Sequence, residues 1–574
     1  NALKNDDSRL ISIFCSACHQ TIYPYHLLYH KKTHKALNLL GFDSPQTKTD
    51  NKILLAQRQK LISKLTKIPK YSEAHGQKID DSFEFLLDNH TPVSYYPLAN
   101  INNPNTFKKV NNALIKALSI CQDKNPTWQR DMEDRFIVID SYGNQSDTCF
   151  LGLVDGSYGA TAAETVAAEL PLLFLDQLAQ TDSSYKMSKD DQQILDSFAT
   201  VLKADHKEKE RIFSDKPGND NTKKTDTYEW IHKAYAKSFW RMDRLLRLGR
   251  NEISKVRWSG CSVVTCLVER IPSEETHGNE EEERKHCENR HSPSARTAKG
   301  VTGLLHIANI GNAHAVLCKN GKSYCLSKEH STSNVSERKR ILQNGGNIST
   351  NEPDGLVEGY LRTTRGLGHH GNPLLKRSVI PVPHTISVPI DNTCQFLILA
   401  TNGLWEVLDY NQVLALTLTT FTDYLRAYKC VQQNKTPSFK CEQLMSLPED
   451  NLNDSKVLND LQDGILYSNE NIFLTDSKGN LKQNKLFFDK PASYTSQELL
   501  KTLSLVGSNS PPFEKDIKTY PSNCKSQTAE VTSKTLYNKA ASYISEQLIK
   551  TALAAGSRDN ITILIVLLNG CDKI

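Results

Sequence analysis

Short runs of apolar residues, separated by turn residues, fill most of the chain after residue 128. Runs of this kind are typical of strands in a packed sheet. We expect strands within the segments 136–140, 150–155, 262–269, 304–311, 315–327, 396–403 and 561–568. Segment 315–327 contains Asn320-Gly321, a dipeptide that favours a two-residue turn, so this segment is expected to form a β-hairpin.

Three longer segments have the periodicity of helices. We expect helices at 160–179, at 226–249 and at 534–555. The last would begin after Ser533 as N-cap and stop at Gly556, a residue type that favours helix ends. Many short strands with a few long helices predict an α+β protein, in which a layered β-sandwich is flanked by helices.

Three polar stretches interrupt this pattern and are expected to be surface insertions. They cover about 180–225, 271–300 and 430–530 and are rich in charged residues, asparagine, serine or proline. With these stretches set aside, residues 121–570 would form one large domain, although 574 residues could supply about four domains.

Residues 1–45 contain cysteines and histidines with the spacing of a zinc finger, Cys15-x2-Cys18-x11-His30-x3-His34. A tetrahedral zinc site needs two thiolates on a tight turn and two imidazoles one helical turn apart. Leu27 and Ile22 could supply the small core. The segment resembles a two-Cys/two-His finger, with a middle spacing one residue shorter than usual. His19 and His26 are alternative ligands, and a reduced segment without metal is the alternative interpretation.

Residues 46–120 are expected to form a basic helix and a linker. In the stretch 51–70, four apolar residues share one helical face, and Pro69 would end the helix; the four are Leu54, Leu61, Leu65 and Ile68. Residues 1–70 carry a net charge of +8, against +5 for the whole chain. We expect this helix to pack on the larger domain rather than lie on a membrane, and its charge to be solvated.

Composition limits the class of protein. Hydrophobic residues make up 38% and charged residues 24%, which argues against a wholly disordered chain. The longest apolar run, 563–568, is far shorter than the ~20 residues of a membrane helix, so we expect no membrane span. Fourteen scattered cysteines suggest a reducing compartment, which would be the cytoplasm, the nucleus or both.

Acidic residues follow or precede several of the expected strands. They occur in Glu133-Asp134, Asp155-Gly156 and Asp559-Asn560. Acids at the ends of neighbouring strands could converge on an oxygen-rich pocket for Mg²⁺ or Mn²⁺. Taken alone, each pair is better explained as a turn or an exposed acidic pair, because such acids are common in turns.

The order of these acids along the chain, and the motifs around them, favour a metal site over ordinary turns. Matching motifs lie at 132–134, 150–160, 259–268, 307–317, 326–331, 337–346, 361–368, 396–409 and 556–566. With these motifs in this order, the sequence resembles the metal-dependent protein serine/threonine phosphatases of type 2C. The resemblance implies two antiparallel sheets with helices on their outer faces. It also implies hydrolysis of phosphoserine or phosphothreonine by water bridging two Mg²⁺ or Mn²⁺ ions.

The residues of the implied metal site are only partly retained. The positions that match the family are Glu133, Asp134, Asp155, Gly156, Asp559 and Asn560. The positions that depart from it are Asn402 and Asn312 in place of Asp, His369 in place of Asp, Ser157 in place of the general-acid His, and Gln129 in place of the phosphate-binding Arg. Arg130 is adjacent to Gln129, but on a strand a shift of one residue would point it to the opposite face.

These departures remove negative charge and the proton donor, so we expect a degenerate member of the family. The main hypothesis is a pseudophosphatase that binds a protein partner or phosphoprotein, with Mg²⁺ or Mn²⁺ bound weakly or not at all. The alternative is a weakened Mg²⁺/Mn²⁺-dependent phosphatase in which Glu133, Asp155 and Asp559 hold one ion. A nucleic-acid-binding role led by the finger is a third hypothesis, which is less expected because one finger reads only about 3 base pairs.

Overall fold

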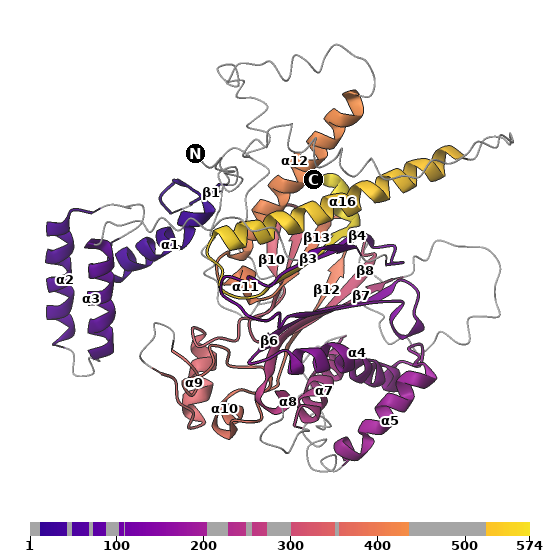
Figure 1. Cartoon of the computed structure of the whole chain (residues 1–574), viewed down its shortest axis with the longest axis horizontal. Helices are drawn as coiled ribbons and strands as arrows, with labels where there is room; N and C mark the ends of the chain where they lie inside the picture. The colour runs from indigo at the N-terminus through magenta and orange to yellow at the C-terminus, as the bar shows by residue number, and fades with distance from the viewer. Residues whose placement is uncertain are drawn as a thin grey trace, which may run out of the picture.

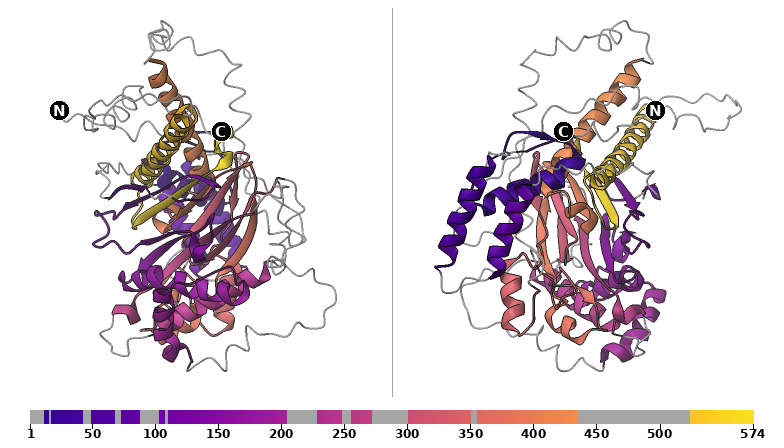
Figure 2. Two further views of the ribbon diagram at one scale, coloured as in Figure 1. Left: turned by 90° about the vertical axis from the view of Figure 1, so that its right-hand side faces the viewer. Right: turned by 60° about the vertical axis from the view of Figure 1, so that its left-hand side comes forward.

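A computed structural model describes residues 12–15, 17–42, 49–67, 73–87, 103–107, 110–203, 228–247, 255–271, 300–349, 355–434 and 524–574. Two six-stranded antiparallel sheets form its centre, as Figures 1 and 2 show. Among the described residues, no helix combines the length and apolar character needed to span a bilayer.

The first sheet has the strand order β10-β9-β13-β14-β4-β3. Its strands are β3 (Asn103–Phe107), β4 (Ile115–Asp123), β9 (His314–Lys319), β10 (Lys322–Cys325), β13 (Cys394–Ala400) and β14 (Ile561–Leu568). Strands β9 and β10 form the expected hairpin, and Asn320 and Gly321 at its turn both have positive φ. The sequence analysis missed β4, whose neighbour β14 lies more than 400 residues away in the chain.

The second sheet has the strand order β12-β8-β7-β6-β5, with β11 paired to β7. Its strands are β5 (Arg135–Asp140), β6 (Thr148–Ser157), β7 (Gly260–Arg270), β8 (Gly303–Ile310), β11 (Leu367–Gly368) and β12 (His384–Ile390). The edge strand β12 was not expected from the sequence.

The central strands are mostly apolar because both of their faces are buried. In β6, Phe150 and Val154 point to the helical side, and Leu151 and Leu153 point to the other sheet. The same alternation holds in β13 and β14. The fold is therefore a sandwich of two antiparallel sheets with helices on both outer faces, as predicted (Figure 1).

One helical layer covers each sheet. The first sheet carries α11 (Asn402–Trp405), α12 (Tyr410–Asn434) and α16 (Cys524–Ala554). The second carries α4 (Thr161–Thr181), α5 (Lys189–Lys203), α7 (Glu229–Leu245) and α8 (Lys255–Trp258), and α9 (Val335–Gln343) and α10 (Pro373–Ser378) lie near its end (Figure 1). Short 3-10 helices occur at Tyr142–Asn144 and Asn569–Lys573.

Two helix boundaries differ from expectation. Helix α16 begins at Cys524, so Ser533 lies inside the helix and is not its N-cap. Helix α5 occupies part of the stretch 180–225, which was expected to be a polar surface insertion and in which no helix was predicted. Residues 204–227, 272–299 and 435–523 lie outside the described residues, and they include about half of the first expected insertion and nearly all of the other two.

The N-terminal part begins with a small hairpin of β1 (Ile13–Phe14) and β2 (Thr21–Ile22), followed by α1 (Pro24–Leu39). Helices α2 (Asn51–Leu65) and α3 (Glu73–Leu87) follow. The predicted helix after residue 51 is thus present, with Asp50 as its N-cap, but Leu54 packs with α1 and α3. The expectation that this helix packs on the larger domain was wrong (Figure 2).

Candidate functional site

The predicted acidic residues Glu133, Asp155 and Asp559 meet at one end of the sandwich, together with Asn402. We call this group of four residues the rim. Asp155 is near the end of β6, Asn402 begins α11 directly after β13, and Asp559 precedes β14. The backbone N–H of Asn402 donates to Asp155 Oδ2 at 2.8 Å. The side-chain amide Nδ2 of Asn402 donates to Asp559 Oδ2 at 3.0 Å. The sequence therefore placed these three residues together correctly.

Asn402 changes the character of this rim. An aspartate at this position would bring a second carboxylate towards Asp559, whereas the amide donates a hydrogen bond to it. The other oxygen of Asp559 accepts the backbone N–H of Asn560 at 2.9 Å. Both oxygens of Asp559 thus already have partners within the protein.

Asp134 lies behind the rim rather than on it. Its side chain is buried, and Oδ2 accepts hydrogen bonds from the hydroxyl groups of Thr401 and Thr562, both at 2.8 Å. Thr401 Oγ1 also accepts the backbone N–H of Thr562 at 2.9 Å. This carboxylate joins the ends of β13 and β14, a role that the sequence analysis missed.

Asn560 fixes the backbone of Glu133. Its Oδ1 accepts the N–H of Glu133 at 2.8 Å, and its Nδ2 donates to the carbonyl oxygens of Lys124 and Asp131. All the polar atoms of this side chain are engaged in positioning the turn before β5. The carboxylate of Glu133 remains at the rim and accepts the N–H of Gly159 at 3.0 Å.

Burial and mutual repulsion raise the pKa of three carboxyl groups, those of Glu133, Asp134 and Asp155. Burial raises the pKa of Asp155 well above its usual range, and the charges of Asp134 and Asp559 raise it further. Burial also raises the pKa of Glu133 and of Asp134. A bound cation or a proton would relieve this repulsion.

The carboxylates of the rim do not converge as closely as the residues of the N-terminal cluster. Among the parts of the chain that the structure describes, one group of three or more Cys, His, Asp or Glu side chains has all its ligand atoms within 4.8 Å. That group is Cys15, Cys18, His30 and His34. The side chains at the rim are not among such groups in the described residues.

Ser157 and His369 occupy the expected positions of the general acid and of a further aspartate. Ser157 Oγ donates to the carbonyl oxygen of Gly260 at 3.2 Å and lies 3.4 Å from His369 Nε2. His369 is 4% exposed, and burial together with the charge of Lys376 lowers its pKa to about 4. Its imidazole is therefore neutral at pH 7 and is a poor acid.

The two remaining departures lie on turns. Gln129 follows β4 in a turn, and its Nε2 donates to the carbonyl oxygen of Arg558 at 2.7 Å. The argument that Arg130 faces the opposite side of a strand was wrong, because neither residue belongs to a strand. Asn312 lies between β8 and β9, where its N–H donates to Ser262 Oγ at 3.3 Å.

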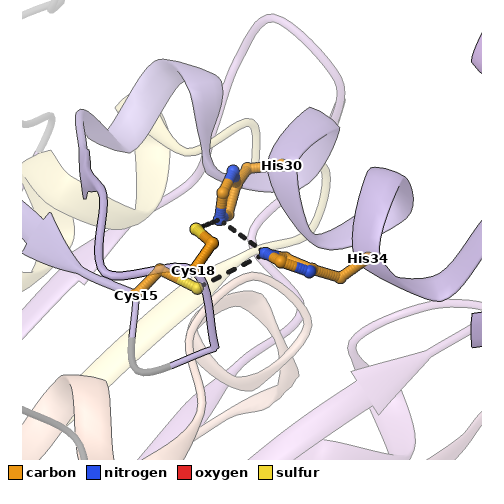
Figure 3. A group of neighbouring side chains, drawn as sticks. All are labelled: Cys15, Cys18, His30 and His34. Carbon is orange, nitrogen blue, oxygen red and sulfur yellow. Dashed lines mark hydrogen bonds between the residues drawn. The ribbon is translucent and has the colours of Figure 1, made fainter. Parts of the chain in front are cut away.

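The predicted zinc ligands form a compact cluster, which Figure 3 shows. Cys15 and Cys18 lie on the turn of the β1–β2 hairpin, and His30 and His34 lie one turn apart on α1. The two Nε2 atoms are 3.1 Å apart, and the closest sulfur–nitrogen distances are 3.4 and 3.5 Å. The alternative ligands His19 and His26 are not part of the cluster.

These distances match those of a tetrahedral zinc site. Zinc–nitrogen bonds of about 2.0 Å and zinc–sulfur bonds of about 2.3 Å place nitrogens about 3.3 Å apart and sulfur about 3.5 Å from nitrogen. Burial and the neighbouring His34 lower the pKa of His30 to about 4, so its imidazole is neutral and able to bind a metal at pH 7.

The family model described as Protein phosphatase 2C matches residues 274–442. A crystal structure of serine-threonine phosphatase 2C from Toxoplasma gondii covers 81% of this chain and 99% of its own, with 15% identity and a TM-score of 0.36.

Two mammalian proteins are similar over nearly the whole length. Protein phosphatase 2C-like domain-containing protein 1 of Homo sapiens is 44% identical, over 97% of this chain and 89% of its own. The Mus musculus protein of the same name is 38% identical, over 98% of this chain and 89% of its own. This identity shows that the chain belongs to the protein phosphatase 2C-like family.

Proposed function

We propose that this protein is a pseudophosphatase, in which a type-2C fold binds a protein partner, such as a phosphoprotein, with little or no hydrolysis. The observation that carries the proposal is the hydrogen bond from Asn402 Nδ2 to Asp559 Oδ2. Where the active family is expected to have two carboxylates facing a cation, this chain has an amide bonded to a carboxylate. The scattered cysteines support a reducing compartment, the cytoplasm or the nucleus.

Loss of charge argues against two ions at this rim. Glu133, Asp155 and Asp559 would hold a single Mg²⁺ or Mn²⁺ ion, which would polarise a phosphoryl oxygen when bound. Asn402 and Asn312 offer amide oxygens without negative charge, and these cannot offset the repulsion between two close dications.

Loss of the proton donor argues against turnover. Ser157 cannot protonate a leaving alkoxide near pH 7, because its hydroxyl is too weak an acid. The nearby His369 does not replace it, since burial keeps its imidazole neutral. Gln129 is held by Arg558 and carries no charge with which to bind phosphate.

A combined binding and activity measurement tests this proposal. Calorimetry should show weak or no Mn²⁺ binding, and an aryl phosphate at saturating Mn²⁺ should be hydrolysed barely or not at all. Asn402→Asp should raise Mn²⁺ affinity roughly tenfold by returning an anionic ligand. Asn402→Ala is the matched control, since it removes the amide without adding charge.

A weakened phosphatase is the second candidate function, and the retained carboxylates of Glu133, Asp155 and Asp559 favour it. Brisk Mn²⁺-dependent turnover by the unmodified protein, abolished by Asp155→Ala, would establish this alternative and reject the pseudophosphatase proposal.

We also propose that Cys15, Cys18, His30 and His34 bind one zinc ion. The support is the agreement between their spacing and tetrahedral geometry. Native mass spectrometry of the full chain should find one zinc per molecule, and Cys15→Ser with Cys18→Ser should remove it. A metal-free protein after purification with added zinc would reject this site.

A further inference from the structure

The β1–β2 hairpin and α1, which together we call the finger, share a hydrophobic core with the sandwich. Ile13 of β1 and Leu27 of α1 are each 2% exposed and belong to the cluster formed by α12, α16 and β14. Ile22 and Leu28 pack against the same cluster. The small core of a free finger would be closed on itself, whereas this core continues into the larger domain.

A glycine permits the close approach of the finger. Gly556 follows the end of α16 with φ of +90°, and a Cβ placed on it would lie 3.1 Å from Leu28 Cδ1. Leu28 therefore packs over the turn between α16 and β14. Asp559 lies on the same turn, three residues further along the chain.

A lysine on α1 fixes the finger to a second turn. Lys31 Nζ donates to the carbonyl oxygen of Val407 at 3.0 Å and to Gln412 Oε1 at 2.8 Å. Asp409 and Gln412 cap the start of α12 through reciprocal bonds between their backbone N–H groups and side chains. Burial lowers the pKa of Lys31, while the nearby charge of Asp409 opposes this shift.

The two turns that the finger contacts are those that carry the rim. Asn402 begins α11, five residues before Val407, and Asp559 lies beyond Gly556. Glu406 links the turns, since its Oε1 accepts the hydroxyl of Ser557 at 2.9 Å and the N–H of Arg558 at 2.7 Å. The finger contacts both members of this linked pair, through Lys31 and Leu28.

We infer that the finger restrains two segments of its own chain, residues 402–412 and residues 556–560. We call this contact the clamp. The clamp rests on the zinc binding proposed above, because zinc would hold the β1–β2 hairpin and α1 in the orientation that docks Leu27 and Lys31. Zinc occupancy then determines how rigidly Asn402 and Asp559 are held. The face of α1 that carries Lys31 is covered by the chain itself, which argues against nucleic acid as its ligand.

Three full-length variants test the clamp. Lys31→Met removes the docking bonds and leaves the zinc ligands intact, Lys35→Met changes an exposed lysine of the same helix, and Cys15→Ser with Cys18→Ser removes the zinc. Zinc content is measured by mass spectrometry, and backbone protection at 402–412 and 556–560 by hydrogen exchange.

We expect Lys31→Met to keep one zinc and to speed exchange in both turns roughly tenfold. Lys35→Met should match the unmodified protein, and the double cysteine variant should lose both zinc and protection. Unchanged protection in both turns for Lys31→Met and for the cysteine variant would overturn the clamp while leaving zinc binding intact. Absence of zinc from the unmodified protein would overturn both zinc binding and the zinc-dependent clamp.

Discussion

At the scale of single residues, close packing around Gly156 constrains the rim. A Cβ on Gly156 would lie 2.6 Å from the carbonyl oxygen of Glu133, a contact that forces the backbone to move. Gly156→Ala should therefore lower the free energy of unfolding by about 1–3 kcal/mol, as other overpacking substitutions do. Thermal denaturation followed by circular dichroism measures this change.

The neighbouring position supplies the control for that experiment. Ser157→Ala removes one half-buried hydroxyl that donates to Gly260, so it should cost only about 1 kcal/mol or less. Equal losses from both variants would show that crowding at Gly156 is not the source of the effect.

Restoring phosphatase activity should require several substitutions at once. Asn402→Asp alone should recover little turnover, because Ser157 and Gln129 still leave the leaving group and the phosphate unassisted. Adding Asn312→Asp, Ser157→His and Gln129→Arg should raise turnover of a phosphothreonine peptide roughly 100-fold above the sum of the single changes, since catalytic groups act as a unit. Initial rates at saturating Mn²⁺ measure this. A purely additive recovery would contradict the cooperative interpretation.

The sequence predicted which residues meet at the rim but not how their side chains point. The convergence of Asp155, Asn402 and Asp559 followed from their places in the family's motifs. The bond between Asn402 and Asp559, and the two threonines around Asp134, depend on segments more than 150 residues apart. No local pattern encodes such contacts, because they arise only when β13 and β14 pair.

At the scale of secondary-structure elements, α9 is tied to the segment before β11 by a buried carboxylate. Glu337 is 2% exposed and bonds to Arg365, Arg340 and Thr364. Burial alone would raise the pKa of Glu337, but Arg365 and the other donors outweigh it and lower the pKa to about 2.

This ion pair predicts an acid-sensitive contribution to stability. In the unfolded chain the carboxyl takes up a proton near its usual pKa of about 4.3, whereas in the folded chain it does so near 2. Its stabilisation is therefore present above about pH 4.3 and is lost as the pH falls to about 2. Glu337→Gln should lower stability at pH 7 by about 3 kcal/mol and flatten this dependence.

Denaturant titrations between pH 3 and pH 7 measure both effects. Glu229→Gln is the matched control, because the pair of Glu229 and Lys233 is more than half exposed and should contribute less than about 0.5 kcal/mol. If Glu337→Gln and the control show the same pH dependence, Glu337 does not supply the acid-sensitive contribution.

Elements with a strong local pattern were predicted well, and those defined by their neighbours were not. The central strands β6, β13 and β14 are continuous apolar runs, and the hairpin of β9 and β10 has its turn dipeptide. Strand β12 lies at a sheet edge with four partly exposed positions in succession, so its pattern is weak. Such a strand is specified by pairing with β8 rather than by its own sequence.

At the scale of the whole molecule, the core between the two sheets joins segments from across the chain. Leu399 of β13 is fully buried in this core, with residues from β4, β6, β7 and β14. Leu399→Ala should lower the free energy of unfolding by about 2–5 kcal/mol, through lost burial and a residual cavity. Leu342→Ala on α9, where the side chain is 50% exposed, should change it by less than about 1 kcal/mol. Urea denaturation compares the two variants.

The position of β14 sets the timing of biosynthesis. This strand lies in the interior of its sheet, between β13 and β4, although more than 400 residues separate it from β4 in the chain. At about 5 to 20 residues per second, the roughly 440 residues between β4 and β14 take about 20 to 90 seconds to translate. Throughout that interval β4 lacks the partner that covers it, and its backbone is open to pairing with other chains. We therefore expect chains that stop before β14 to leave one edge of β4 unpaired, and hence to be prone to aggregation.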